Sequence, residues 1–303
     1  MPNTIKSFHS LSVENPDFAV HPRFWTANHL SIVNSRFQQI ETDDAHGLRN
    51  LDIQTAERLA ESAKKLAVGS VAGTKYLWVE NLLLRKGKSP ITLSSPHLSF
   101  YYAQRRDRLA DSRVHTFRIK DEISIPYADP MIGYYRYSAD EERRQMLRAP
   151  RPPRGLKNSP VQRKYDARYR KMTPADWRND PYLVCILLSL AQLQQRKAYG
   201  PRALFLAGLL VTNMADRTNA YVYKADVPYQ LLESLDCPTR SIEDFDFPLV
   251  NYVKIPFEPY STFSERVQVH LAGAEYSPRS SPVGSTLMGP SSPRGKKRNR
   301  DEE

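Results

Sequence analysis

The chain has 303 residues, of which 40% are hydrophobic, and it carries a formal net charge of +11 with a pI of about 9.5. This charge favours an anionic partner such as nucleic acid, an anionic membrane or an acidic protein. The two cysteines, Cys185 and Cys237, exclude a disulfide framework and a cysteine-rich zinc site, and they suit a reducing compartment.

The start of the sequence lacks the apolar run of a secretory signal. The longest apolar run, within residues 182–193, is shorter than the roughly 20 residues that a membrane helix needs. We therefore expect a soluble protein of the nucleus or cytoplasm that does not bind a membrane.

Residues 1–50 mix aromatic and polar side chains without a clear period, and we expect an irregular arm there. Residues 51–140 are expected to form an N-terminal α/β part packed on the core. Within it, residues 52–68 have the apolar spacing of a helix, with Asp52 as the N-cap and Gly69 at the end.

The rest of this part is less regular. Residues 74–84 fit either a helix or a strand, whereas 91–93 and 114–125 read as strands. No element is assigned to residues 126–138, which are rich in tyrosine and are interrupted by prolines.

Residues 141–174 are expected to be a basic, proline-rich connector. Eleven lysines and arginines lie between residues 142 and 171, against two acids, so this segment holds most of the net charge. Its end, 163–171, can form a short basic helix. Cations interleaved with Tyr165, Tyr169 and Trp177 could contact phosphates and stack on unpaired bases. The alternative is a solvated linker, or a segment lying over an acidic face of the same protein. The candidate nucleic-acid contacts are Arg163, Lys164, Arg168, Arg170 and Lys171.

Residues 175–272 contain the densest apolar pattern and are expected to form the core. Asp180 and Pro181 are typical of a helix start, and this helix should run to about Ala198. The expected elements that follow are strands at 203–212 and 220–225, a helix starting at Asp226, a strand at 249–255 and a helix capped by Thr262 with Glu265. The order α-β-β-α-β-α predicts an α+β (mixed α/β) fold with a small mixed sheet packed by helices.

Residues 273–303 are rich in serine, proline and basic residues and are expected to be disordered. The cluster formed by Lys296, Lys297, Arg298 and Arg300 has the character of a nuclear-import signal, with an import receptor as its partner. The alternative is a tail that only improves solubility. Ser277, Ser281 and Ser292 each precede proline and are candidate phosphorylation sites.

The core block resembles a family of uncharacterised fungal proteins. The matching elements run from Trp177-Arg-Asn-Asp-Pro-Tyr-Leu-Val184 through Ala220-Tyr-Val-Tyr-Lys-Ala225 to Ile255-Pro-Phe-Glu-Pro-Tyr260 and Phe263. The resemblance covers about residues 177–263. It implies a shared fold unit and a fungal origin, and it carries no activity, cofactor or catalytic residue with it.

No catalytic, cofactor or metal-binding constellation emerges from the spacing of the histidines, cysteines and acids. We therefore expect a non-enzymatic interaction module, with a protein or nucleic acid as its partner and an oligomeric state that the sequence leaves open. One alternative is a nucleic-acid-binding protein that uses the basic connector. Another is a divergent restriction-endonuclease-like nuclease, in which Lys224 would need acids beside it to hold Mg²⁺. Tyrosine stands where that acid is required, and Asp216 and Asp226 only flank the strand.

Overall fold

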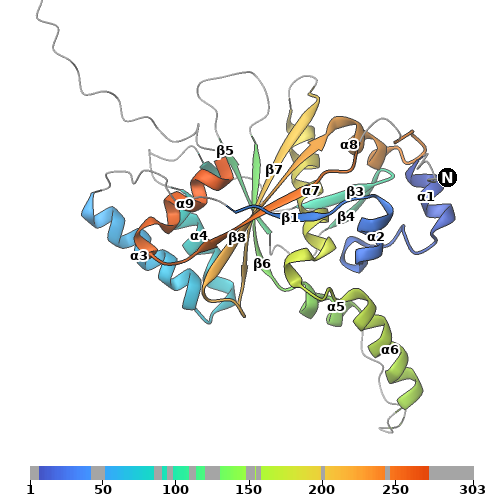
Figure 1. Ribbon diagram of the computed structural model, residues 1–303, viewed down its shortest axis with the longest axis horizontal. Helices are drawn as coiled ribbons and strands as arrows, with labels where there is room; N and C mark the ends of the chain where they lie inside the picture. Colours follow the sequence, from blue (N-terminus) through green and yellow to red (C-terminus); the bar gives the residue numbers. More distant parts are fainter. Residues whose placement is uncertain are drawn as a thin grey trace, which may run out of the picture.

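A seven-stranded mixed sheet lies at the centre of the computed structural model, and helices cover both of its faces (Figure 1). Its strands run in the order β1-β9-β8-β7-β6-β5-β2. The predicted mixed α/β class is therefore confirmed. The residues that the structure describes are 7–41, 52–84, 91–93, 98–108, 114–119, 130–147, 154, 158–198, 202–242 and 246–272.

Strands from both halves of the chain share this sheet. β6 pairs in parallel with β7, and β1 pairs in parallel with β9, whereas the other neighbours are antiparallel. The connection from β6 to β7 passes through the basic segment and the helix α7. The strands are β1 (Phe37–Gln39), β2 (Ile91–Leu93), β5 (Val114–Ile119), β6 (Met131–Tyr137), β7 (Leu204–Asn213), β8 (Asn219–Pro228) and β9 (Val250–Pro256).

The helix α7 (Pro181–Lys197) packs on one face of the sheet, and every residue from Pro181 to Gln192 is buried. The side chain of Asp180 caps the helix by accepting from the backbone N–H of Tyr182, as predicted. The outer side of α7 is covered by the hairpin of β3 (Ser99–Tyr102) and β4 (Arg105–Arg108). The amide of Gln192 holds this hairpin through two hydrogen bonds to the backbone of Tyr101, at 3.0 and 2.8 Å. This cover explains why the helix is apolar on nearly every side.

The opposite face is covered by α3 (Ile53–Val68), α4 (Lys75–Leu83) and α9 (Tyr260–Ala272), as Figure 1 shows. The predicted cap of α3 is confirmed, because the side chain of Asp52 accepts from the N–H of Thr55. The ambiguous segment 74–84 forms a helix. Strand residues alternate between the two faces, so Tyr221 and Tyr223 point toward α7 while Val222 points toward α9.

Several expectations are corrected by the structure. The interior strand β6 lies within residues 126–138, to which the pattern assigned no element. Its tyrosines pack in the core, and Pro130 comes just before the strand begins, where a missing N–H costs nothing. The strand β8 continues past Asp226, so the following helix, α8 (Tyr229–Asp236), begins three residues later than expected. The residue expected to cap the last helix, Thr262, lies inside α9.

The arm before residue 50 also contains regular elements that the sequence did not predict. These are α1 (Phe8–Glu14), the short 3-10 helix η1 (Pro22–Phe24), α2 (Ala27–Ile32) and β1. They gather around a cluster of aromatic rings, in which Phe18 contacts Phe8, Trp25 and His29. Ring packing, rather than a periodic apolar face, orders this part of the chain.

Candidate nucleic-acid interface

The basic segment contains one long exposed helix, α6 (Ser159–Met172), which extends away from the body of the fold (Figure 1). Asn158 caps its start by accepting from the N–H of Val161 at 3.3 Å. Pro160 lies in the first turn, where its missing N–H leaves no helical bond unmade. The expected helix at 163–171 is therefore confirmed, and it begins earlier than the prolines suggested.

All five predicted contact residues lie on α6, and all five are exposed. At about 100° per residue, their side chains fall within an arc of roughly 160° around the helix axis. The arc includes the uncharged residues Pro160 and Ala167, and the acid Asp166 lies outside it. The five residues are Arg163, Lys164, Arg168, Arg170 and Lys171.

The two tyrosines of α6 lie on the side of the helix opposite this arc. The rings of Tyr165 and Tyr169 stack on each other, with centroids 6.5 Å apart and planes inclined by 7°. The guanidinium of Arg144, from α5 (Ala139–Leu147), lies 4.9 Å from the centre of the Tyr169 ring. The Nε of Arg144 also donates to the hydroxyl of Tyr169 at 2.8 Å. These contacts fix the face of α6 that is turned toward α5.

The carboxyl end of α6 is anchored on the body, whereas its amino end is exposed. Met172 is buried, and Arg168 lies 6.0 Å above the ring of Phe24 in η1. Lys171 Nζ lies 3.9 Å from a carboxylate oxygen of Asp17, a contact between two exposed side chains that contributes little. In contrast, every residue from Asn158 to Lys164 is exposed.

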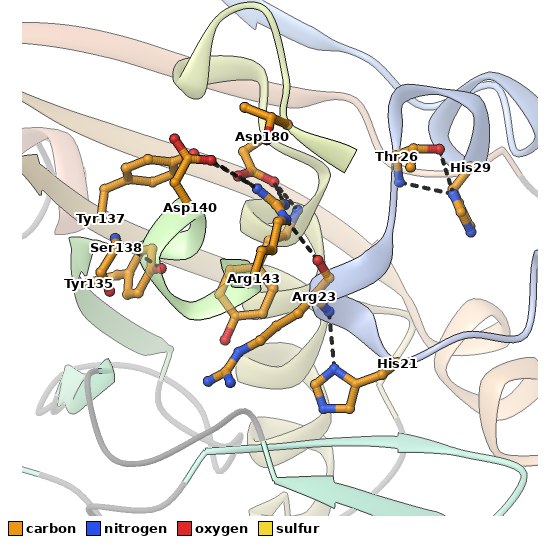
Figure 2. A network of polar contacts seen from close by, with 12 residues as sticks. His21, Arg23, Thr26, His29, Tyr135, Tyr137, Ser138, Asp140, Arg143 and Asp180 are labelled. Atoms are coloured by element: carbon orange, nitrogen blue, oxygen red, sulfur yellow. Dashed lines mark hydrogen bonds and ion pairs between the residues drawn. The ribbon is translucent and has the colours of Figure 1, made fainter. Parts of the chain in front are cut away.

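A buried ion pair joins the two helices on either side of α6 in the chain. The guanidinium of Arg143 in α5 donates to both carboxylate oxygens of Asp180, the N-cap of α7 (Figure 2). Both side chains are fully buried. The Nε of Arg143 donates to the backbone carbonyl of Arg23 at 2.8 Å, so the same guanidinium also binds the N-terminal arm.

Further buried polar groups surround this pair. The hydroxyl of Tyr137 donates to Asp180 at 2.8 Å. Burial, followed by the charge of Asp180, raises the pKa of Tyr137 well above its usual value, so this hydroxyl keeps its proton. A second ion pair lies beside the first, between Arg23 and Glu142 at 2.9 Å, and the hydroxyl of Ser138 donates to Glu142 at 2.6 Å. Ionic contacts among η1, α5 and the start of α7 thus hold together the part of the fold from which α6 extends.

Trp177, the third aromatic residue proposed for base stacking, is part of the body. Its ring contacts Tyr137 and Tyr221, at centroid distances of 5.0 and 5.1 Å. The neighbouring Arg178 forms an ion pair with Asp176 at 2.9 Å. These contacts place Trp177 in a row of rings along the sheet and not on the exposed helix.

Of the two acids named in the nuclease alternative, only Asp226 lies near Lys224. Lys224 is exposed on β8. Among the described residues, Asp226 is the acid that interacts electrostatically with Lys224. Asp216 lies in the turn before β8, where it accepts from the hydroxyl of Tyr221 at 2.8 Å. Tyr221 and Lys224 are three residues apart in a strand, so they point to opposite faces of the sheet. The structure therefore separates Asp216 from Lys224.

Metal-ligating side chains do not cluster within the described part of the chain: no three histidine, cysteine or acidic residues there could share an ion. Cys185 is buried in α7, and burial raises the pKa of its thiol well above the usual value. Cys237 is exposed. No helix in the described ranges has both the length and the apolarity needed to cross a membrane.

The sites predicted in the tail lie outside the described residues. They remain sequence predictions: the import cluster Lys296, Lys297, Arg298 and Arg300, and the serines Ser277, Ser281 and Ser292.

The buried role of Arg143 was missed at the level of sequence, where it counted as one of eleven connector cations. The acid Glu142 immediately before it was the available signal. An acid within a basic run can mark a place where charges pair rather than face water.

In the comparisons with known proteins, no protein-family model matches this chain and no curated protein is significantly similar to it.

Proposed function

We propose that the protein is an interaction module that binds nucleic acid through the cationic face of α6, and that it acts by binding rather than by catalysis. The observation that carries this proposal is the arrangement of Arg163, Lys164, Arg168, Arg170 and Lys171 on one side of an exposed, extending helix. Lysine and arginine that neutralise phosphates release condensed counterions, and this release supplies most of the affinity of non-specific nucleic-acid binding.

The composition of this face favours nucleic acid over an acidic protein. Protein–protein interfaces usually have an apolar or aromatic centre, and they are depleted in lysine although enriched in arginine. The arc on α6 offers only Pro160 and Ala167 between its cations, while the two tyrosines of the helix lie on the other side. Such a surface can attract a polyanion, and Val161 at its edge is the one large apolar side chain of α6 that is exposed to a protein partner among the described residues.

The contact between α6 and the body supports a binding role as well. Its carboxyl end is anchored through Met172, and the segment is bounded by the buried pair of Arg143 and Asp180. A cationic helix held at one end keeps its charges together at a fixed place, which lowers the entropy lost on binding.

A salt titration of binding tests the proposal. Full-length protein is titrated into fluorescently labelled DNA at several salt concentrations, and the slope of log K against log salt is measured. If all five cations contact phosphates, the slope is about −4.5 for a duplex. The substitutions Arg163→Gln and Lys164→Gln together should reduce its magnitude by up to about 1.8 and weaken binding by roughly tenfold or more near 0.1 M salt.

The matched control is Arg58→Gln with Lys64→Gln. It removes the same two residue types from exposed positions on α3, which lies on the other face of the sheet (Figure 1). This control should retain nearly all of the affinity. Equal losses in the two double variants would refute the assignment to α6, and equal binding of DNA and polyglutamate would refute nucleic acid as the partner. A third variant, Lys297→Gln with Arg298→Gln, measures the contribution of the basic tail.

A further inference from the structure

The aromatic rings near the cationic helix are engaged by other parts of the protein. Proteins that bind single strands combine a basic groove with rings on which unpaired bases stack. Here Tyr165 and Tyr169 stack on each other, and Arg144 covers Tyr169 at 4.9 Å. Trp177 packs edge to face against Tyr221, with planes inclined by 88°. Stacking a base on Tyr169 or Trp177 would disturb these contacts.

The tyrosines are also turned away from the cations. Around the helix, the centre of the cationic arc and the centre of the two tyrosines are separated by roughly 160°. A strand whose phosphates lie along Arg163 and Lys164 would therefore carry its bases on the side opposite the rings. Only Arg168, three residues after Tyr165, lies beside one of these rings, so most phosphate contacts and any base stacking on the tyrosines would be on different sides of the helix.

The free half of α6 has dimensions that fit a duplex groove. The helix has 14 residues and is thus about 21 Å long. From Asn158 to Lys164 every residue is exposed, so this half can be reached by a ligand. A helix with its side chains is about 10–12 Å wide, and the major groove of B-form DNA is about 12 Å wide.

The remaining cations are placed to contact the edges of such a groove. Arg168, Arg170 and Lys171 lie one to two turns further along the helix, and Arg168 and Lys171 contact the N-terminal arm. With the amino end of α6 in the groove, these three side chains reach the phosphates on its border. Resting on the proposed function, we infer that the nucleic acid is double-stranded DNA, that the amino half of α6 enters its major groove, and that single strands bind more weakly.

Few side chains on the inserted half can distinguish base pairs. Asn158 caps the helix, the amide of Gln162 donates to Asp166 at 2.9 Å, and the Nε of Arg163 donates to the Ser159 carbonyl at 3.4 Å. These three side chains therefore already have partners within the helix, and Lys164 and the remaining nitrogens of Arg163 are the groups best able to reach a base edge. The binding is therefore largely independent of base sequence, since phosphate contacts carry no sequence information.

The test compares three labelled ligands at one fixed salt concentration. These are a DNA duplex of about 20 base pairs, which covers two helical turns, one of its strands alone, and the RNA duplex of the same sequence. The full-length protein should bind the DNA duplex at least about tenfold more tightly than the single strand. The RNA duplex should also bind more weakly than the DNA duplex, because its major groove is too narrow for a helix.

A variant separates ring stacking from phosphate contact. Tyr165→Leu keeps an apolar side chain on the body side of α6 and removes the ring. It should change the affinity for the DNA duplex by less than about threefold, because no base stacks there. A single strand that binds as tightly as the duplex, equal binding of RNA and DNA duplexes, or a tenfold loss in Tyr165→Leu would overturn the inference. Failure of all three ligands to bind would instead refute the proposed function itself.

Discussion

Arg143 and Asp180 lie 37 residues apart in the chain, yet their fully buried side chains form a two-point ion pair. The pair joins the two ends of the segment that carries α6, because Arg143 belongs to α5, the helix before α6, and Asp180 caps α7, the helix after α6. Two buried charges lose much of their hydration, so each depends strongly on the presence of the other.

Removing one charge of this pair should therefore be costly. Asp180→Asn retains a side chain that can cap α7, but it leaves the Arg143 guanidinium buried without its counter-charge. We expect the free energy of unfolding, measured by urea denaturation, to fall by about 3–5 kcal/mol. The double variant Arg143→Met with Asp180→Asn should lose less than the sum of the two single variants.

The control for this prediction is Asp140→Asn. Asp140 lies 3.7 Å from the same guanidinium, but its side chain is 43% exposed. Its loss should reduce the stability by less than about 1 kcal/mol, as for other partly solvated ion pairs. Equal effects of Asp140→Asn and Asp180→Asn would show that the buried pair has no special role.

The sequence predicted one member of this pair and missed the other. Asp180 precedes proline and an apolar run, which is a local signal for a helix start, and the structure confirms it. Apart from the neighbouring acid Glu142, nothing local distinguishes Arg143 from the exposed cations that follow it, because its burial depends on Asp180 and on the Arg23 carbonyl, far away in the chain. Local patterns fix caps and periodic faces, whereas contacts between distant segments select which charge is buried.

The same distinction applies to the interior strand β6 and to α6. β6 was not predicted because Pro130 and Gly133 interrupt the pattern, although its tyrosines are buried by packing against α7 and α4. α6 was predicted in part, since the cations and their helical spacing are local features. Its extension from the body follows from how α5 and α7 are placed, which the sequence alone did not reveal.

Gly133 lies at a close approach between β6 and α7. A Cβ at this position would lie 2.8 Å from Leu209 Cδ1 and 3.0 Å from Leu190 Cδ1, and both leucines are fully buried. Gly133→Ala should therefore lower the free energy of unfolding by about 1–3 kcal/mol through overpacking. The matched control is Gly208→Ala on the neighbouring strand, where the nearest atom would be 3.5 Å away. That variant should be neutral or slightly more stable, and a loss equal to that of Gly133→Ala would contradict the packing argument.

The contact between Arg144 and Tyr169 should control how firmly α6 is held on the body. Arg144→Met removes both the hydrogen bond to the tyrosine hydroxyl and the cation over its ring. We expect amide exchange in the carboxyl half of α6, near Met172, to become about tenfold faster, because local opening then breaks fewer contacts. Hydrogen exchange followed by mass spectrometry measures this change. Tyr169→Phe keeps the ring and should have a smaller effect, and unchanged exchange in both variants would show that other contacts hold the helix.

Lys75 should give the protein a stability that increases with pH above about 8. Its Nζ is buried at the start of α4, where it donates to the Leu66 carbonyl at 2.6 Å. Burial, followed by the charges of Arg136 and Arg217, lowers its pKa from 10.5 to about 8. Between these two values the unfolded chain binds a proton that the folded protein has released, so the free energy of unfolding increases as the pH rises.

This contribution can be isolated by substitution. From pH 7.5 to 9.5, Lys75 should add about 2 kcal/mol to the free energy of unfolding, and Lys75→Met should remove this increase. Measurements should stop at pH 9.5, because burial raises the pKa of core tyrosines such as Tyr134, to about 12, and their ionisation then favours unfolding. Lys64→Met, at an exposed position on α3, serves as the control and should retain the pH dependence of the wild type. If Lys75→Met has the same pH dependence as the wild type, the Lys75 amine is not the group that titrates, and its burial does not destabilise the charged form.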